Sequence, residues 1–488
     1  MADLGAGRGT CCLRAHRAVA PGRGYPTSSQ AVSLPGAAVL AAALLTNVAG
    51  IDAAVQNALA GPALKGAHIG VAVVEPRGGT LLYGHDAGGA YLPASTLKLL
   101  TSATALAVLG QAARPRTQLV YDGVTLTLVG GGDPLLGEQD LGGAAAAVAA
   151  SGLTDVQRLA VDQSYYAAPF YPAGWSWDDL AAYYAPPITA LALEENALDV
   201  DVTPGTNVGD PAVVRVEEAY GDGLYADAAV TGAAGTPATA DCALTREPWA
   251  VRIAGNVPMG GAPIQQGCAV LEPAAFAAAV LTGALQAQGV RVESSVGAAS
   301  APAGSRMLWS HEGASVGELI AKMLPPSDNF IADELCRWIA KQRDPAASFS
   351  ACAQAQRAYA ASIGIDAGTL SLYDGSGLSR YDLLAPRDLA LLLAALSRGP
   401  YADLVRGALA RPGHAGTLLH RFEGSPAAAR VVAKTGSMEH VDNLAGYVRS
   451  ADDGDLAFAV LIQGFTGEDR REAARRAAER IVEAIAAL

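Results

Sequence analysis

Strand patterns at the two ends of this chain are separated by a long middle segment of different character, and this constrains the fold more than any other feature. The stretch AHIGVAVVEPRGGTLLYG, which begins at Ala67, predicts two strands joined by a turn. Near the end, RVVAKTGSM, NLAGYVRS and LAFAVLIQGF each predict a strand, and only short turns separate them. Residues 116–304 instead show short strand patterns, many glycines and Ala-rich helices. The simplest arrangement is one sheet built from both chain ends and split by a long insertion.

Helical patterns accompany both groups of strands. A helix is expected over residues 94–110, because a proline precedes an apolar run that ends at glycine. Residues 470–488 form a closing helix, which we expect to pack on the preceding strands; an amphipathic membrane anchor is the alternative. The fold class is therefore a multidomain α+β or α/β protein. Its main domain combines residues 51–115 and 305–488 in a mostly antiparallel sheet flanked by helices. Residues 116–304 form an inserted α/β accessory region of two nested domains.

The first fifty residues are typical of an export signal. Arginines with little acid precede the apolar run LPGAAVLAAALLTNV, residues 34–48, and small residues follow it. This run is short for a membrane span, which needs about 20 residues. We predict a leader over residues 1–50 with cleavage near Gly50, and hence an exported protein. A disordered leader followed by a buried helix is the alternative.

The cysteines agree with export to an oxidising compartment. Cys11 and Cys12 lie in the leader, which leaves four cysteines in the remainder. Four cysteines allow three connectivities; we expect Cys242–Cys268 and Cys336–Cys352, with unpaired buried thiols as the alternative. No cysteine or histidine spacing resembles a metal site, so no metal or other cofactor is predicted.

The net charge of −13 argues against nucleic acid as a main partner, because nucleic acid needs a basic face. A local cationic pocket remains compatible with this charge.

The stretch LPASTLKLLTSA places a hydroxyl and an amine one helical turn apart. Ser95 and Lys98 are i and i+3, so they share one face at the start of the predicted helix. A serine hydroxyl is a poor nucleophile until a neighbour takes its proton, and a lysine whose pKa is lowered by burial can do so. Alone, the pattern is also that of an amphipathic helix with a snorkelling lysine.

Two further short motifs follow in order. PPSDNF places Ser327 and Asn329 at a break between two helices, where such residues also serve as helix caps. AKTGSM, in a late strand, carries Lys434 as a fixed cation. Thr435 and Ser437 point to the same side of that strand, and Gly436 between them leaves room for a peptide laid alongside.

Together the three motifs, in this order and these contexts, are the set found in penicillin-binding proteins and serine β-lactamases. From Ala67 to the end, the chain resembles the class C low-molecular-mass penicillin-binding proteins, which are D-Ala-D-Ala carboxypeptidases and endopeptidases. The segments GGGDPLL, GWSWDDLAAYY, DGSGLSR, GTLLHR and NLAGYV also match. The gap between Ser95 and Ser327 is far longer than β-lactamases have. The resemblance implies a penicillin-recognising, β-lactamase-like catalytic domain interrupted by the insertion.

The resemblance also implies a role for each motif residue. Ser95 is the acylated nucleophile and Lys98 its proton acceptor. Ser327 relays the proton to the leaving nitrogen, Lys434 keeps the local field positive, and Asn329 holds the substrate carbonyl. The backbone N–H groups of Ser95 and Ser437 form the oxyanion hole. The hydroxyls of Thr435 and Ser437, beside Gly436, bind the terminal carboxylate; many relatives carry threonine where this chain has Ser437.

Four residues are expected at a substrate side-chain subsite. The third residue of a stem peptide, if it is meso-diaminopimelate, ends in an amine and a carboxylate. Asp179 and Arg380 are suitable partners, with Tyr184 and Met438 as apolar walls. A helix-start charge is the alternative for Asp179, and a surface ion pair is the alternative for Arg380.

Other polar residues are given structural roles. His440 belongs to a solvated turn, because a serine–lysine site needs no imidazole. Asp374 forms a turn. Glu194 and Glu195 lie in the insertion, in a context unlike that of the deacylating glutamate of class A β-lactamases.

The sequence thus predicts an exported serine DD-peptidase that acts on peptidoglycan stem peptides and is acylated by β-lactams; D-Ala cross-links are the second expected substrate. Membrane association is at most peripheral. The rival classes are a β-lactamase, against which the long insertion argues, a non-catalytic cell-wall or β-lactam sensor, and an esterase.

Overall fold

A five-stranded antiparallel sheet joins the two ends of the chain. The computed structural model describes residues 35–216, 225–246, 249–451, 454–466 and 468–488. The strand order is β14-β15-β16-β1-β2, and β1 pairs along its length with β16, from His68 opposite Gln463 onward. The strands are β1 (His68–Glu75), β2 (Thr80–His85), β14 (Val431–Met438), β15 (Val441–Arg449) and β16 (Asp455–Gln463). The expected sheet from both chain ends is confirmed, and β14 is one of its edges.

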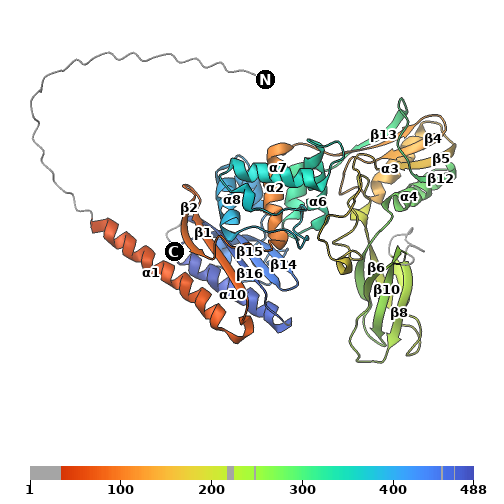
Figure 1. Ribbon diagram of the computed structural model, residues 1–488. Helices are drawn as coiled ribbons and strands as arrows, with labels where there is room; N and C mark the ends of the chain where they lie inside the picture. The colour runs from red at the N-terminus through yellow and green to blue at the C-terminus, as the bar shows by residue number, and fades with distance from the viewer. Residues whose placement is uncertain (1–34, 217–224, 247–248, 452–453, 467) are drawn as a thin grey trace, which may run out of the picture. The chain divides into compact units, whose positions relative to one another are not determined.

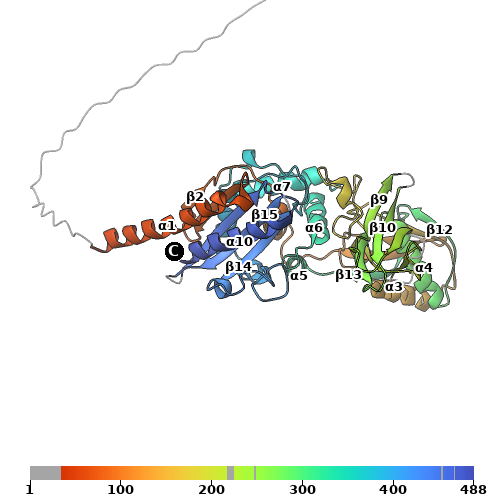
Figure 2. The ribbon, with the colours of Figure 1, turned by 90° about the horizontal axis from the view of Figure 1, so that it is seen from below.

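Both faces of this sheet are covered by helices. Alternate residues of β1 face opposite sides, so Ala72 and Val74 join one apolar cluster while Val71 and Val73 join another. The first cluster packs against α2 (Lys98–Val108), α6 (Asn329–Lys341), α7 (Phe349–Ser362) and α8 (Pro386–Arg398) (Figure 1). The second packs against α10 (Glu468–Ala486), which contacts β15 and β16 and is seen beside β15 in Figure 2. This explains why the central strands are apolar on both faces.

The closing helix packs on the strands, as predicted. Ala474, Ile481 and Val482 of α10 are fully buried in the second cluster. Helix α1 (Pro35–Ala60) contributes Ile51 and Val55 to the same cluster and continues through the expected cleavage site at Gly50. The leader residues 1–34, with Cys11 and Cys12, lie outside the described residues.

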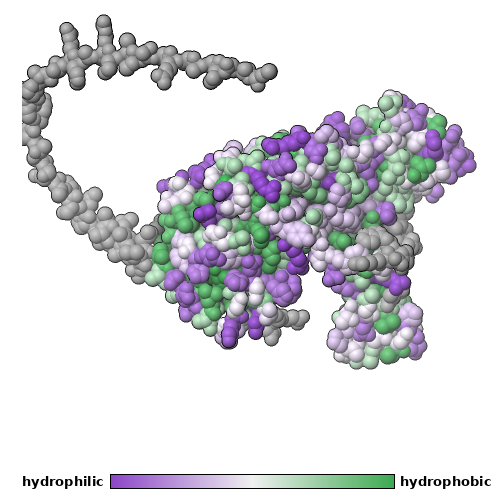
Figure 3. Space-filling model, viewed as in Figure 1, coloured by the Kyte–Doolittle hydropathy of each residue, from purple (hydrophilic) through white to green (hydrophobic). Residues whose placement is uncertain are grey.

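No helix within the described ranges has the length and apolar character needed to span a bilayer. On the face drawn in Figure 3, hydrophilic and hydrophobic residues are interspersed.

The helices that frame the site begin at side-chain caps. Ser315 caps α5 (Val316–Met323), Asp328 caps α6 and Ser348 caps α7, each accepting a backbone N–H three residues on. A short helix, α9 (Ala402–Ala408), follows α8. The expected helix over 94–110 is present, but its first turn is a 3-10 helix, η2 (Ala94–Leu97), and α2 begins only at Lys98.

The middle of the chain forms three further sheets. The outer one has the order β12-β5-β4-β3-β13, and the sheets β11-β6-β7 and β8-β10-β9 are inserted in sequence between β5 and β12. Helices α3 (Glu138–Ala150) and α4 (Pro273–Ala287) pack with the outer sheet. Strand β13 lies at 306–312 and pairs with β3, so these residues, which the sequence analysis placed in the main domain, belong to the outer sheet. The strands are β3 (Arg116–Tyr121), β4 (Thr125–Val129), β5 (Asp155–Asp162), β6 (Ala197–Thr203), β7 (Val213–Val216), β8 (Tyr225–Gly232), β9 (Asp241–Arg246), β10 (Trp249–Pro258), β11 (Ile264–Ala269), β12 (Arg291–Ala298) and β13 (Arg306–Glu312).

Two disulfides connect cysteines that are neighbours in sequence. Cys242 is bonded to Cys268, between β9 and β11, and Cys336 is bonded to Cys352, between α6 and α7. The expected pairing is confirmed, and the alternative of free buried thiols is wrong. The second bond fixes the helix that carries Asn329 to its neighbour.

Candidate active site

Ser95 lies in a tight turn that other segments approach very closely. In the 3-10 turn η2, residues i and i+3 project in almost the same direction, which places Ser95 over Lys98. A Cβ atom added to Gly377 would lie 1.9 Å from the carbonyl oxygen of Ala94, and one added to Gly436 would lie 2.7 Å from that of Pro93. Glycine at both positions is therefore needed to let two chain segments close on the turn. For Gly436 this contact, rather than space for a substrate peptide, accounts for the missing side chain.

The amine of Lys98 is enclosed by three oxygen atoms. Its Nζ lies 2.8 Å from Ser95 Oγ, 2.6 Å from Asn329 Oδ1 and 2.8 Å from the carbonyl oxygen of Ser376. The lysine is completely buried. The last two contacts can only accept a proton, because a carbonyl oxygen has none to give.

Burial lowers the pKa of Lys98 to about 8, against the opposing charges of Asp333, Asp374 and Asp328. Asp333 is itself completely buried, and burial together with the charge of Asp374 raises its pKa well above the usual range. Asp333, Asp374 and Asp382 form a buried acid cluster. The charges of Asp333 and Asp374 favour the protonated amine of Lys98, while burial favours the neutral amine.

Asp374 is more than the turn residue expected from sequence. It is completely buried and accepts backbone N–H bonds from Gly377 at 2.7 Å and Ser379 at 2.7 Å. It also accepts the indole N–H of Trp175 at 2.9 Å. One carboxylate therefore ties the loop that provides the Ser376 carbonyl to a segment of the inserted region.

The S-D-N motif lies at the predicted break between helices. Ser327 has φ of +72°, an unusual left-handed conformation for a serine, in the turn between α5 and α6. Asp328 then caps α6, and Asn329 is its first residue. Asn329 accepts from Lys98 and donates its Nδ2 to the carbonyl oxygen of Tyr184 at 3.0 Å. The asparagine therefore links the amine to the inserted region.

Strand β14 presents the K-T-G motif at the edge of the sheet. The backbone N–H of Ala433 donates to Ala410 O, on the side away from β15. Since N–H directions alternate along a strand, the N–H groups of Thr435 and Ser437 point to the same open edge. Lys434 is completely buried and donates to Thr435 O at 2.8 Å. Burial, with the nearby charge of Lys98, lowers its pKa well below the usual range.

Two cavities meet at Ser95, and Ser327 and Ser437 also line both. The first has a volume of about 370 Å³ and contains all four residues of the expected side-chain subsite. These are Asp179, Tyr184, Arg380 and Met438.

In this first cavity, Tyr184 donates its hydroxyl to Asp179 Oδ1 at 3.0 Å. The other carboxylate oxygen, Oδ2, is buried and has no hydrogen-bond partner among the described residues. Asp179 is the last residue of the one-turn 3-10 helix η3 (Trp177–Asp179), so it also lies in the first turn, as the alternative of a helix-start charge expects. Arg380 is exposed, and its guanidinium forms no ion pair within the described parts of the chain.

The second cavity has a volume of about 610 Å³ and also borders Ser95. Thr435 and Ser437 of β14 line it, together with Thr417, Arg421 and residues of α10. Ser95 therefore borders two cavities that share Ser327 and Ser437 and are otherwise lined by different residues.

His440, Glu194 and Glu195 lie in surroundings that indicate structural roles. His440 is half exposed in the turn between β14 and β15, with Nδ1 2.8 Å from the carbonyl oxygen of Phe465. Glu194 and Glu195 line neither cavity. Glu194 accepts the backbone N–H of Glu138 at 2.9 Å, as expected for a structural residue of the inserted region.

The sequence profile described as the D-Ala-D-Ala carboxypeptidase 3 (S13) family matches residues 51–485. The chain belongs to this family. The family is one of serine peptidases, so the expected enzyme class is confirmed.

Two related carboxypeptidases and one solved structure agree with this family. A D-alanyl-D-alanine carboxypeptidase of Actinomadura sp. (strain R39) is 34% identical over 86% of this chain and 81% of its own length. The D-alanyl-D-alanine carboxypeptidase DacB of Haemophilus influenzae is 26% identical over 79% of this chain and 83% of its own. The crystal structure of penicillin-binding protein 4 (dacB) from Haemophilus influenzae superposes with a TM-score of 0.80 at 25% identity, covering 89% of this chain and 99% of that one. The predicted resemblance and fold class are confirmed.

Sequence reasoning missed several residues of the site. The Ser376 carbonyl, the buried Asp333 and Asp382, and the cavity-lining Arg421 and Arg475 received no role. The segments DGSGLSR and GTLLHR had been noted only as matching stretches. In the sequence these segments show only polar residues in ordinary turns. Such a pattern does not indicate which residues the turns contact.

A Gly436→Ala substitution tests the close packing of η2 against β14. The new Cβ would lie 2.7 Å from a backbone oxygen, so a segment must shift, and we expect a loss of about 1–3 kcal/mol in the free energy of unfolding. Denaturant unfolding measures it. Gly407→Ala, in helix α9 with nothing within 4 Å of its Cβ, serves as the control and should be neutral or stabilising. Equal effects of the two substitutions would contradict the packing assignment.

Proposed function

We propose that this D-Ala-D-Ala carboxypeptidase works through an acyl-enzyme on Ser95, with Lys98 as its base. The observation that carries the proposal is the set of three oxygen atoms around Lys98 Nζ. A neutral amine has two protons and one lone pair. The carbonyl oxygens of Asn329 and Ser376 take the two protons, so the lone pair faces the Ser95 hydroxyl. The geometry therefore selects the state that removes a proton from the nucleophile.

In the proposed acylation, Ser95 Oγ bonds to the carbonyl carbon of the penultimate D-Ala, and the hydroxyl proton of Ser95 passes to Lys98. The C–N bond then breaks, and the leaving amine receives the proton through the Ser327 hydroxyl. The N–H groups of Ser95 and Ser437 stabilise the oxyanion, a donor of this kind being worth about 3–4 kcal/mol. Water then hydrolyses the ester.

The remaining motif residues bind the substrate in this proposal. The hydroxyls of Thr435 and Ser437 hold the terminal carboxylate, and buried Lys434 supplies positive charge behind them. The first cavity takes the side chain of the third stem-peptide residue. The free Asp179 Oδ2 would accept its amine, Arg380 would pair with its carboxylate, and Tyr184 and Met438 would form the walls.

We also propose how the chain is divided into domains and where the protein acts. Residues 51–115 and 305–488 form the catalytic domain, with β13 shared with the insertion, and residues 116–304 form an accessory region. Export by the leader of residues 1–50 would bring the enzyme to peptidoglycan, outside the cytoplasm. The disulfides support this, because such bonds persist in oxidising compartments.

Ser95→Ala should abolish covalent labelling by a fluorescent penicillin, while the wild-type protein takes up one equivalent. The label should leave slowly, because neither cavity presents a carboxylate assigned to activate water for deacylation. Intact-mass analysis measures both. The matched control is Ser102→Ala, on the same helix, where the hydroxyl only bonds the helix carbonyl of Lys98. Rapid turnover of penicillin would instead favour the β-lactamase rival, and labelling of Ser95→Ala would contradict the nucleophile assignment.

Acylation by penicillin should speed up with pH and level off near pH 8. The base must be neutral, and the lowered pKa of Lys98, about 8, means that its protonated form dominates below that value. The second-order rate constant should therefore rise about tenfold per unit between pH 6 and 7.5. The exposed Lys65→Ala variant should give the wild-type profile, and a flat profile through pH 6–8 would exclude Lys98 as the base.

Asp179→Asn should lower kcat/KM about tenfold for a pentapeptide whose third residue carries a free side-chain amine. It should leave the N-acetylated peptide almost unchanged, because only the free amine forms a charge-assisted bond. Release of D-alanine measures both. Asp178→Asn, the exposed neighbour, is the matched control. An equal loss for both peptides would contradict the subsite.

A further inference from the structure

The proposed function places a carboxylate in the second cavity, and the cation it names for that carboxylate, Lys434, is buried outside the cavity lining. Thr435 and Ser437, the two hydroxyls proposed to bind the terminal carboxylate, line this cavity. Lys434 does not line it, and its amine is turned to Thr435 O inside the protein. A carboxylate held by neutral hydroxyls alone would lack a counterion in the cavity.

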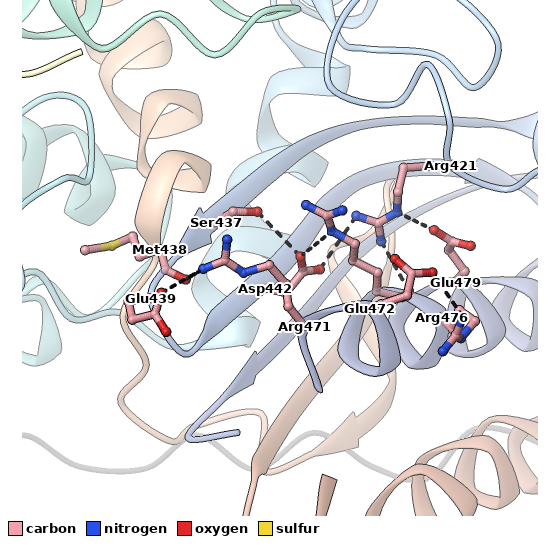
Figure 4. Close-up of polar contacts among 10 residues, drawn as sticks. Arg421, Ser437, Met438, Glu439, Asp442, Arg471, Glu472, Arg476 and Glu479 are labelled. Atoms are coloured by element: carbon pink, nitrogen blue, oxygen red, sulfur yellow. Dashed lines mark hydrogen bonds and ion pairs between the residues drawn. The ribbon is translucent and has the colours of Figure 1, made fainter. Parts of the chain in front are cut away.

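Two arginines line the same cavity, and they differ in availability. Arg421 has a side chain that is 9% exposed; its Nε donates to Glu479 and its Nη2 donates to Arg475 O at 3.2 Å. Its remaining nitrogen, Nη1, lies 3.6 Å from Asp442 Oδ1. The guanidinium of Arg421 is therefore taken up by the protein (Figure 4).

Arg475 is free at its outer end. Its side chain is 41% exposed, and its Nε lies 3.5 Å from Asp442 Oδ2. Neither terminal nitrogen has a hydrogen-bond or ion-pair partner in the part of the chain that the structure describes. Of the two acids of α10 in the same lining, Glu479 is held by Arg421 and Glu472 pairs with Arg476 at 3.3 Å. Arg475 is thus a cation with two unused donors beside the carboxylate-binding strand.

Asp442 holds the two arginines in this arrangement. Its carboxylate is completely buried on β15 and lies between Ser437 Oγ, at 3.5 Å, and the arginines (Figure 4). The pairing of Ser437 with Asp442 across β14 and β15 places the two side by side. Each oxygen of the buried Asp442 carboxylate lies near one arginine. The contact with Nε orients Arg475, so its two terminal nitrogens are directed away from Asp442.

We propose that Arg475 is a specificity-determining residue that pairs with the carboxylate of the leaving amino acid, and that Asp442 is the residue that positions it. The ligand class is a leaving group with a free α-carboxylate beside the scissile amide. The cavity of about 610 Å³ leaves room for a longer leaving group that carries such a carboxylate, as in a cross-linked peptide. This inference rests on the proposed function.

The test compares two substrates that differ only in charge, an acyl-D-Ala-D-Ala peptide and the same peptide with a terminal carboxamide, on the full chain. Arg475→Gln should lower kcat/KM for the acid about 10- to 100-fold and change that for the amide less than about twofold. Asp442→Asn should lower the acid value by a smaller factor, about 3- to 10-fold, and leave the amide value unchanged. Arg480→Gln, an exposed arginine further along α10, removes the same charge outside the cavity and should change neither.

Acylation of Ser95 by penicillin and by its methyl ester gives the same comparison without turnover of the amide. Arg475→Gln should lose the preference for the free acid in both assays while keeping the wild-type unfolding temperature. An equal loss for acid and neutral forms, or no loss for either, would overturn the role of Arg475. A wild-type enzyme that does not distinguish the acid from the neutral form would overturn it as well. If the wild-type protein neither releases D-alanine nor is acylated, the proposed function itself fails, and this outcome is distinct from the others.

Discussion

The structure depends on one buried amine. Lys98 has no exposed surface, and an isolated ammonium at such a position would cost several kcal/mol. Three features make the position tolerable: two carbonyl oxygens and a hydroxyl within hydrogen-bond distance, nearby buried carboxylates, and a pKa lowered to about 8. The oxygen atoms and the carboxylates hold the side chain, and the lowered pKa leaves a fraction of the Lys98 amine in its neutral form. Each oxygen comes from a different segment of the chain, so the fold must be complete before the amine is satisfied.

The acid cluster shows how the inserted region and the catalytic residues are mechanically joined. Asp374 holds the Ser376 loop by backbone bonds and reaches Trp175 of the insertion, while Asn329 reaches the backbone of Tyr184. Both links run from the groups around Lys98 to the inserted region, and Tyr184 lines the first cavity. A change in the position of the insertion would therefore reach the surroundings of Lys98 as well as this cavity.

Most of the fold was predictable because its signals are periodic and local. The strands of the central sheet and the break at Ser327 follow from apolar runs and turn residues, and the order of three motifs placed Ser95, Lys98 and Lys434 in one site. The partners of Lys98 were harder. A backbone oxygen such as that of Ser376 has no side-chain signature, and Asp374 reads as a turn residue until its burial is known. The 3-10 geometry of η2 and the use of Gly436 depend on contacts between distant segments. The pairing of β13 with β3 likewise depends on a partner far away in sequence.

The pairing of β1 with β16 has a consequence for how the protein comes into being. During synthesis β1 emerges early, but its second neighbour is made almost at the end, after the whole insertion. Until then β1 has only β2 beside it, and long-range pairings of this kind form slowly. A nascent chain would thus carry an open strand edge for most of its translation. The sheet whose edge carries β14 is therefore completed only after the insertion has been made.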